Sequence, residues 1–101
     1  MNDITKVSDI TAEDVWEYLR PAEEMDTDSE TTLNNLIGIA KAFISNYTGR
    51  TLEELDNYQD FVIVMFVLCQ DMWDNRTLYV DKTNLNYVVD SILGLHQVNL
   101  L

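Results

Sequence analysis

The longest apolar stretch of the chain is FVIVMFVLC, nine apolar residues in succession at 61–69. Residues 58–75 hold no Gly or Pro, and their apolar content continues through Met72 and Trp73. The β-branched Val and Ile would suit a strand, but the segment is too long for a typical one. The pattern therefore predicts a central helix that is apolar on all sides and covered on several of them. Part of its surface is expected to be covered by a neighbouring subunit.

An amphipathic helix is predicted near the N-terminus. Residues 12–19 place apolar side chains three and four positions apart, which indicates one buried face. Thr11 and Asp14 stand at the two capping-box positions of its start. Pro21 is expected to end this helix, because proline disfavours helical backbone in the residue before it.

A longer helix follows an acidic loop. The apolar positions in residues 33–47 form one stripe and predict a helix of about 20 residues, or about 30 Å. Thr27 or Asp28 is the expected N-cap. Gly49 is expected just past the C-terminal end, since glycine adopts the left-handed conformation at little cost. The preceding PAEEMDTD, residues 21–28, is expected to be the loop.

The remaining segments predict shorter elements. TLEE, residues 51–54, is a second capping box that starts a turn or short helix. Residues 76–83 are expected to be a connector with a short extended piece at 78–80. Residues 85–93 predict a last amphipathic helix, stopped at Gly94. The fold class is therefore all-α: one domain over residues 1–101, a small bundle of four or so helices around a central apolar helix, with an extended C-terminal tail.

The charge of the chain limits the partners that it can bind. Eighteen Asp and Glu face six Lys and Arg, and the formal net charge is −12. Proteins that grip nucleic acid or anionic lipid use Lys and Arg, so both classes of binder are disfavoured. The apolar run is also shorter than the ~20 residues of a membrane helix. No membrane partner is expected.

The sequence contains few residues arranged for catalysis or metal binding. DTDSE, residues 26–30, resembles the start of a calcium loop, but the positions that need Gly and Glu hold Thr31 and Ile37. Asp71 and Asp74 are one carboxylate pair at helical spacing, where a Mg²⁺-dependent all-α hydrolase needs several. The expectation is therefore no metal, no cofactor and no catalytic residue, and the protein is not predicted to be an enzyme.

Four other side chains are candidates for a functional role. Cys69 lies inside the apolar run and is expected to be a buried thiol. Trp73 is expected to belong to the core. Arg50 and Arg76 each follow a predicted helix end, where a cation is favourable. They could equally pair with acids, either within the subunit or across an interface.

Three segments together resemble a known family. They are ITAEDVWEYLR at 10–20, AKAFISNYTGRTL at 40–52 and MWDNR at 72–76. Their order and spacing resemble the small head–tail connector proteins of tailed bacteriophages, also called head-completion, adaptor or DNA-packaging proteins. The resemblance covers roughly residues 8–95. The chain departs from it in LEELDNY at 52–58, which lacks a Pro that relatives often carry, and its last helix is a weaker match.

The resemblance implies a structural role in the virion. Members form a ring of about twelve subunits under the portal, joined to the portal protein and to a tail or stopper protein. DNA passes through the ring without specific binding. A protein of this family would be made in the cytoplasm of the bacterial host and end in the head–tail connector. The resemblance assigns architectural roles to six residues: Tyr47, Gly49, Arg50, Trp73, Asn75 and Arg76.

The tail and the acids complete this hypothesis. The tail, residues 95–101, is expected to be disordered in the monomer and to order on docking to a portal or a neighbouring ring. Its candidate docking residues are Leu95, His96, Val98, Leu100 and Leu101. Carboxylates on a ring lumen would repel DNA phosphates within a Debye length of about 8–10 Å. The acids at 23–30 or at 53–60 are the candidates for that position.

Two other function classes remain open. An acidic protein could mimic DNA and inhibit a host DNA-binding enzyme, which would require carboxylates in rows at phosphate-like spacing. A Mg²⁺-dependent nucleotide hydrolase is the third reading and would use Asp71 and Asp74. A pull-down with basic nucleases would identify the DNA mimic. A nucleotide-hydrolysis assay would identify the hydrolase.

Overall fold

The computed structural model describes residues 4–98, and within this range it contains helices and no strands. The all-α class is thus confirmed. Two short 3₁₀ helices, η1 (Val7–Asp9) and η2 (Glu54–Asn57), accompany four α-helices: α1 (Ala12–Leu19), α2 (Thr27–Thr48), α3 (Asp60–Asn75) and α4 (Tyr87–His96).

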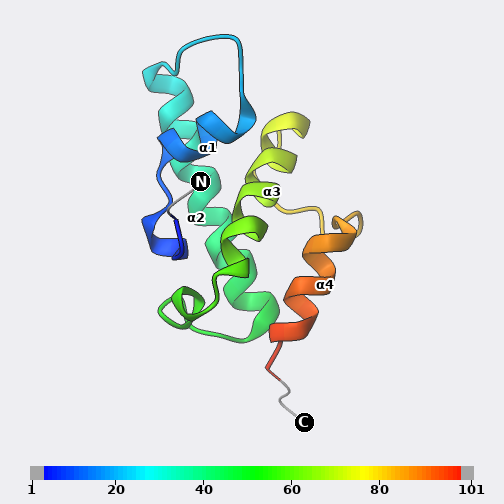
Figure 1. The fold of residues 1–101 in the computed structure, drawn as a ribbon. Coiled ribbons are helices and arrows are strands. Elements are labelled where there is room, and N and C mark those ends of the chain that lie inside the picture. The colour runs from blue at the N-terminus through cyan, green and yellow to red at the C-terminus, as the bar shows by residue number, and fades with distance from the viewer. Residues whose placement is uncertain (1–3, 99–101) are drawn as a thin grey trace.

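Helices α2 and α3 form an antiparallel pair at the centre of the molecule (Figure 1). Helices α1 and α4 lie on opposite sides of this pair, and each contacts both of its members. The molecule measures 47 × 29 × 20 Å, with α2 running along much of the longest dimension. The two ends of the α2–α3 pair are therefore well separated and can be described individually.

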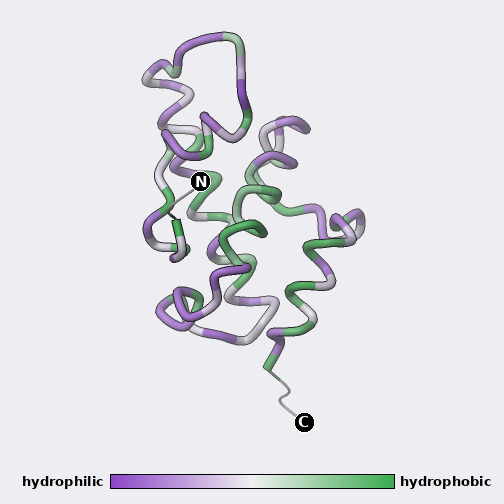
Figure 2. The backbone as a smooth tube through the Cα atoms, in the orientation of Figure 1, coloured by the Kyte–Doolittle hydropathy of each residue, from purple (hydrophilic) through white to green (hydrophobic). Residues whose placement is uncertain are grey.

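The apolar stretch forms most of α3, as predicted. Eight side chains of α3 are buried: Phe61, Val62, Val64, Met65, Phe66, Leu68, Cys69 and Met72. The apolar character of the α2–α3 pair is visible along the centre of Figure 2. Ile63 is 47% exposed and Val67 is only partly buried, so one face of this helix reaches solvent. The helix is apolar all round, but its own chain covers only part of its circumference.

Local signals fixed the start and end of α1. The Asp14 N–H donates to Thr11 Oγ1 over 3.2 Å, and the Thr11 N–H donates to Asp14 Oδ2 over 2.9 Å. This reciprocal pair is the predicted capping box. Helix α1 ends at Leu19, and Arg20 before Pro21 has a φ of 50°. The proline therefore follows the helix end, as predicted.

The start of α2 lies one residue earlier than expected. Asp26, and neither Thr27 nor Asp28, is the N-cap, because Asp26 Oδ1 accepts the Ser29 N–H over 2.7 Å. Thr27 and Asp28 already have helical backbone. Hydrogen bonding, first from the Ser29 backbone and then from its side chain, lowers the pKa of Asp26.

The connector and α4 differ more from the expectation. Residues 78 and 79 form bends, and residues 78–80 contain no strand. Helix α4 begins at Tyr87, where Asn86 Oδ1 accepts the N–H groups of Val88 (2.8 Å) and Val89 (3.4 Å). The helix also runs through Gly94 to His96. A glycine inside a helix costs only about 1 kcal/mol, which contacts at the helix end can offset.

Candidate functional site

The six residues that the resemblance selected fall into two groups at opposite ends of the α2–α3 pair (Figure 1). One end, here called the corner end, comprises residues 47–50, 58–60 and 96–98. The other, called the groove end, comprises residues 26–32 and 73–78. The structure therefore brings together the members of each group, but not the two groups.

Gly49 makes the corner between α2 and the following loop. Its φ is 74°, and its N–H donates to the Ser45 carbonyl over 2.9 Å. A Cβ at this position would lie 3.6 Å from the Val98 Cβ, an ordinary contact distance. The positive φ, which an L-residue adopts only with strain, is thus the reason for a glycine here.

Arg50 joins three parts of the chain at the corner end. Its Nε donates to the His96 carbonyl over 2.7 Å, and its guanidinium carbon lies 4.6 Å from the centre of the Tyr58 ring. One Nη lies 3.7 Å from Glu54 Oε2. The sequence left open whether Arg50 pairs within the subunit; in the structure its partners are in its own chain.

His96 closes the same end from the side of α4. Its Nε2 lies 2.8 Å from Asp60 Oδ2 at the start of α3. Its ring centre lies 4.4 Å from that of Tyr58 and 4.9 Å from that of Phe61. The imidazole is thus held by an acid and two aromatic rings, and it anchors the last turn of α4.

The expectation of a disordered tail is wrong for residues 95–98. The Val98 N–H donates to the Thr48 carbonyl over 2.7 Å, and Gln97 Nε2 donates to the Tyr47 carbonyl over 3.3 Å. These bonds satisfy carbonyls at the end of α2, which lack partners within the helix. Leu95 is 82% exposed and points away from this contact. Leu100 and Leu101 lie outside the described residues.

Tyr47 connects α2 to α4 above the corner. Its hydroxyl donates to Asp90 Oδ1 over 2.8 Å. This hydrogen bond raises the pKa of Tyr47, and burial and the charge of Asp90 act in the same direction. Tyr47, Thr48 and Arg50 therefore each make a hydrogen bond to residues 90–98, which makes the corner end a closed joint.

Trp73, Asn75 and Arg76 finish α3 at the groove end. Trp73 packs edge-on against Trp16 of α1, with 5.8 Å between the ring centres. Asn75 Nδ2 donates to the Asp71 carbonyl within its own helix over 2.8 Å. Trp73 is only partly buried and packs against the core, in agreement with its predicted role, and Trp16 packs against the core in the same way.

Arg76 adopts the left-handed conformation that usually favours glycine. Its φ is 57°, and the Thr77 N–H donates to the Met72 carbonyl over 3.0 Å, which closes the helix end. The guanidinium carbon lies 5.9 Å from the centre of the Trp73 ring. Arg76 is exposed, and no ion pair to it lies within 4 Å among residues 4–98.

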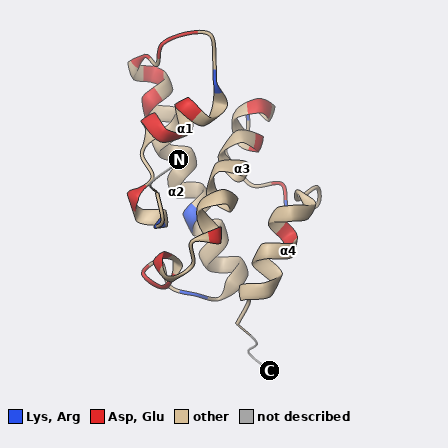
Figure 3. Cartoon of the chain, viewed as in Figure 1, with Lys and Arg blue, Asp and Glu red and all other residues tan. Residues whose placement is uncertain are grey.

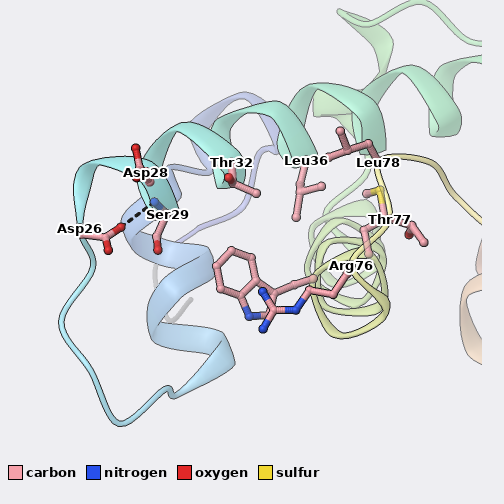
Figure 4. Close-up of a pocket in the computed structure, with 10 residues that line it drawn as sticks. Asp26, Asp28, Ser29, Thr32, Leu36, Arg76, Thr77 and Leu78 are labelled. Carbon is pink, nitrogen blue, oxygen red and sulfur yellow. Dashed lines mark hydrogen bonds between the residues drawn. The ribbon is translucent and has the colours of Figure 1, made fainter.

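A groove of about 310 Å³ separates the first turns of α2 from the end of α3 (Figure 4). Leu36, Met72, Trp73 and Leu78 supply its apolar wall, and Arg76 lies across the Trp73 ring. Asp26, Asp28, Ser29 and Thr32 line the groove along the start of α2, the helix that also carries Leu36. Arg76 at the groove end is thus exposed, whereas Arg50, which follows the other long helix at the corner end, is hydrogen-bonded within the chain.

The acids are concentrated around the groove end (Figure 3). Residues 13–30 contain eight carboxylates and one base, Arg20. These acids are Glu13, Asp14, Glu17, Glu23, Glu24, Asp26, Asp28 and Glu30. By contrast, residues 31–52 contain no acid at all. The negative charge therefore belongs mainly to one end of the molecule.

Large exposed apolar side chains also occur in the connector and on α4, and one of them, Leu78, lines the groove as well. The apolar strip, as it is called below, consists of Leu78 (64% exposed), Tyr79 (62%), Tyr87 (83%), Val88 (53%) and Leu95 (82%). Large apolar patches on a soluble domain commonly mark interaction sites. Of the residues in the strip, only Leu95 was a candidate for docking from the sequence, because the apolar pattern of residues 85–93 predicted one buried face and residues 78–80 were expected to be a short extended piece.

The structure offers no metal site among residues 4–98, since no three His, Cys, Asp or Glu side chains there are arranged to hold an ion. Burial raises the pKa of Asp71, and the neighbouring charge of Asp74 adds to the effect. The described part of the chain also has no buried side-chain N or O without a hydrogen-bond partner. The carboxylate pair at the end of α3 thus has no further ligand beside it.

Some partners at the corner end were recognisable in the sequence and others were not. The Arg50–Glu54 pair has the i, i+4 spacing of neighbours on a helix. Asp60 and Asp90, the partners of His96 and Tyr47, lie 36 and 43 residues away in sequence. No local pattern connects residues at such separations.

Comparisons of this chain with protein-family models, with curated proteins and with solved structures found no match. In the described range, no helix combines the length and apolar character required to span a bilayer. The relation to head–tail connector proteins therefore stays a prediction.

Proposed function

We propose that this protein is a structural subunit of a phage head–tail connector. Several copies would form a ring that joins the portal to a tail or stopper protein and lets DNA pass. The protein would act by binding and assembly in the virion, without catalysis or a cofactor.

The observation that carries the proposal is the separation of two surfaces. The apolar strip offers Leu, Val and Tyr side chains with few charges nearby, which is typical of the core of a protein interface. The carboxylates of residues 13–30 gather at the groove end instead. A subunit of a DNA-conducting ring needs both surfaces, one to contact other proteins and one to repel phosphates.

The two helix ends support the same proposal. The Tyr47–Arg50 corner joins α2 to the chain leading into α3, and Trp73, Asn75 and Arg76 close α3. These are the architectural positions that the resemblance implies. The acids at 23–30, at one end of the molecule, are the better candidates for a rim that DNA passes, because three of the four at 53–60 are engaged by partners in the chain.

The test is assembly with a portal. Purified protein added to portal rings should give a second ring layer in negative-stain images. Phage that lack the gene should accumulate filled heads and free tails that do not join. Normal joining of heads and tails without this protein would disprove the proposal.

The density of acids at residues 13–30 supports one alternative, a DNA mimic that inhibits a basic enzyme. Asp14 and Asp26 are used as helix caps, which leaves fewer carboxylates free for a phosphate-like row. Capture of a nuclease or another DNA-binding enzyme from host extract, competed by DNA, would favour this alternative. Binding to portal in the same assay would favour the connector.

A further inference from the structure

Helix α4 has a second apolar face that its own chain leaves uncovered. Val89 and Leu93 are fully buried against the bundle. Tyr87, Val88 and Leu95 are exposed on the other side of the helix, and Ser91 lies between them at spacings of three and four residues. This spacing is the one by which a helix packs against another helix.

Helix α2 has an outward face of the opposite character. Its exposed residues between positions 31 and 46 are Thr31, Asn34, Asn35, Gly38, Ala42 and Asn46, all of them uncharged and most of them small. A Cβ added at Gly38 would have no atom within 4 Å. Lys41, which is partly exposed, is the only charged residue between positions 31 and 46, so this chain with a net charge of −12 places no acid along more than four turns of α2.

We infer that the exposed face of α4 in one copy packs on the outward face of α2 in a second copy. This inference rests on the proposed function, because it names the contact by which copies would form the ring. Large side chains of α4 would lie over the small residues of α2, where Gly38 and Ala42 permit close approach of the two helices. The two surfaces differ, so the contact is head-to-tail, and such a contact closes into a ring when the rotation between successive copies divides a full turn.

The distribution of charge favours this contact between two copies over a contact through other surfaces. The only charged residues within 31–52 are Lys41 and Arg50, whereas the segment of the apolar strip, 78–95, carries Asp81 and Asp90 against Lys82. The two faces are thus weakly opposite in sign. A contact through residues 13–30 would instead bring carboxylates of two copies together and cost free energy.

The height of α4 along the molecule agrees with this contact. Within one chain, α4 and the residues after it bind the C-terminal half of α2, through Tyr47 with Asp90 and Thr48 with Val98. Rotation about an axis parallel to the long dimension keeps this height. It would place α4 of one copy level with Ala42 and Asn46 of the next, and the acids of residues 13–30 of each copy would lie along one rim of the ring, outside the contact between copies.

Two cysteine variants test the contact. Ala42→Cys and Ser91→Cys each place a thiol at the centre of one face, both at exposed positions. The native Cys69 does not interfere, because it is buried and burial raises its pKa to about 12. One variant carries an affinity tag, so that a mixed pair differs in mass from a pair of like chains. A short thiol-specific cross-linker should join unlike chains at least about tenfold more than like chains.

The matched control replaces Ala42→Cys by Leu52→Cys, which is 58% exposed but lies in the loop after the corner. This control should give little product with Ser91→Cys. Predominant joining of two Ser91→Cys chains, or equal joining by the Leu52→Cys control, would overturn the inference. Absence of any product at high protein concentration would overturn it as well.

A substitution on the other side separates this inference from the proposed function. Gly38→Arg meets no neighbouring atom in its own chain, so it should leave the circular dichroism spectrum unchanged and weaken self-association at least about tenfold. If Gly38→Arg still forms rings on portal, the assigned contact is wrong while the connector proposal stands. If the unsubstituted protein forms no ring on portal, the connector proposal itself fails.

Discussion

Arg50 and Arg76 occupy similar places in the sequence but different places in the structure. Each follows the end of a long helix, Arg50 after α2 and Arg76 after α3. Arg50 is half-buried and contacts His96, Tyr58 and Glu54. Arg76 is exposed and lies on Trp73 beside the groove.

The comparison shows that a closed joint needs a third element. At the corner end, α4 supplies the His96 carbonyl for Arg50 and continues to Thr48 through Val98. At the groove end the connector leaves α3 without covering the start of α2, so the groove stays open. We therefore expect the contacts at the corner end to stabilise the fold, whereas the groove end and the apolar strip are available to bind partners.

The largest contrast is expected between two leucines, one in η2 beside the corner end and one at the groove end. Leu55 in η2 is fully buried, whereas Leu78 at the groove is 64% exposed. Leu55→Ala should lower the free energy of unfolding by about 2–5 kcal/mol, because it leaves a cavity in the core. Leu78→Ala should change it by less than about 0.5 kcal/mol. Urea unfolding followed by circular dichroism measures both, and similar losses would contradict the comparison.

Replacing the two arginines should give a smaller contrast. Arg50→Ala should cost about 1–3 kcal/mol, because the His96 carbonyl loses its charged donor and Tyr58 its covering guanidinium. Arg76→Ala should be within about 0.5 kcal/mol of the original chain. Arg50→Lys is the control that keeps the charge and loses the Nε donor, and it should recover only part of the loss. An effect of Arg76→Ala as large as that of Arg50→Ala would show that the groove end is also a stabilising joint.

Substitutions at the left-handed residues of the two ends should change the free energy of unfolding in opposite directions. Arg76 has a φ of 57° and Gly49 a φ of 74°. Arg76→Gly should stabilise the protein by about 1 kcal/mol, since it removes the strain of a side chain in this conformation. Gly49→Ala should destabilise it by about 1–2 kcal/mol for the converse reason. Thermal unfolding of the two variants measures the signs, and equal signs would refute this explanation of both positions.

The smallest contrast concerns two hydrogen-bonded carboxylates. The Ser8 side chain, followed by the Ser8 N–H, lowers the pKa of Asp56 in η2, whereas the Ser29 N–H contributes most at Asp26. Ser8→Ala should therefore raise the pKa of Asp56 more than Ser29→Ala raises that of Asp26. NMR titration of the two carboxyl groups measures these pKa values, and equal shifts would contradict the assignment.

The same hydrogen bond makes stability depend on pH. Because the folded-state pKa of Asp56 is lowered, its stabilising contribution is present above the ordinary value of 3.8 and is lost as the pH falls through the lowered one. Ser8→Ala should reduce stability at neutral pH by less than about 1 kcal/mol. The difference between the variant and the original chain should vanish in acid, where Asp56 is protonated in both.

The elements with local signals were predictable from the sequence. The capping box of Thr11 and Asp14, the positive φ of Gly49 and the helical nature of residues 61–69 are confirmed. Each depends on residues within about one or two helical turns of one another. The N-cap at Asp26 was missed by one residue, because four neighbouring residues, Asp26 to Ser29, can all cap a helix.

The sequence by itself determined an all-α chain with a central apolar helix, its caps and its strong negative charge, because these follow from periodicity and composition. Only the tertiary structure decided which of two similar arginines is half-buried, that residues 95–98 bind α2, and that α4 exposes a second apolar face. The physical reason is distance along the chain: His96 meets Arg50 and Asp60, and Val98 meets Thr48, only after the helices pack. The contacts of the α4 end together outweigh the local tendency of Gly94 to stop a helix.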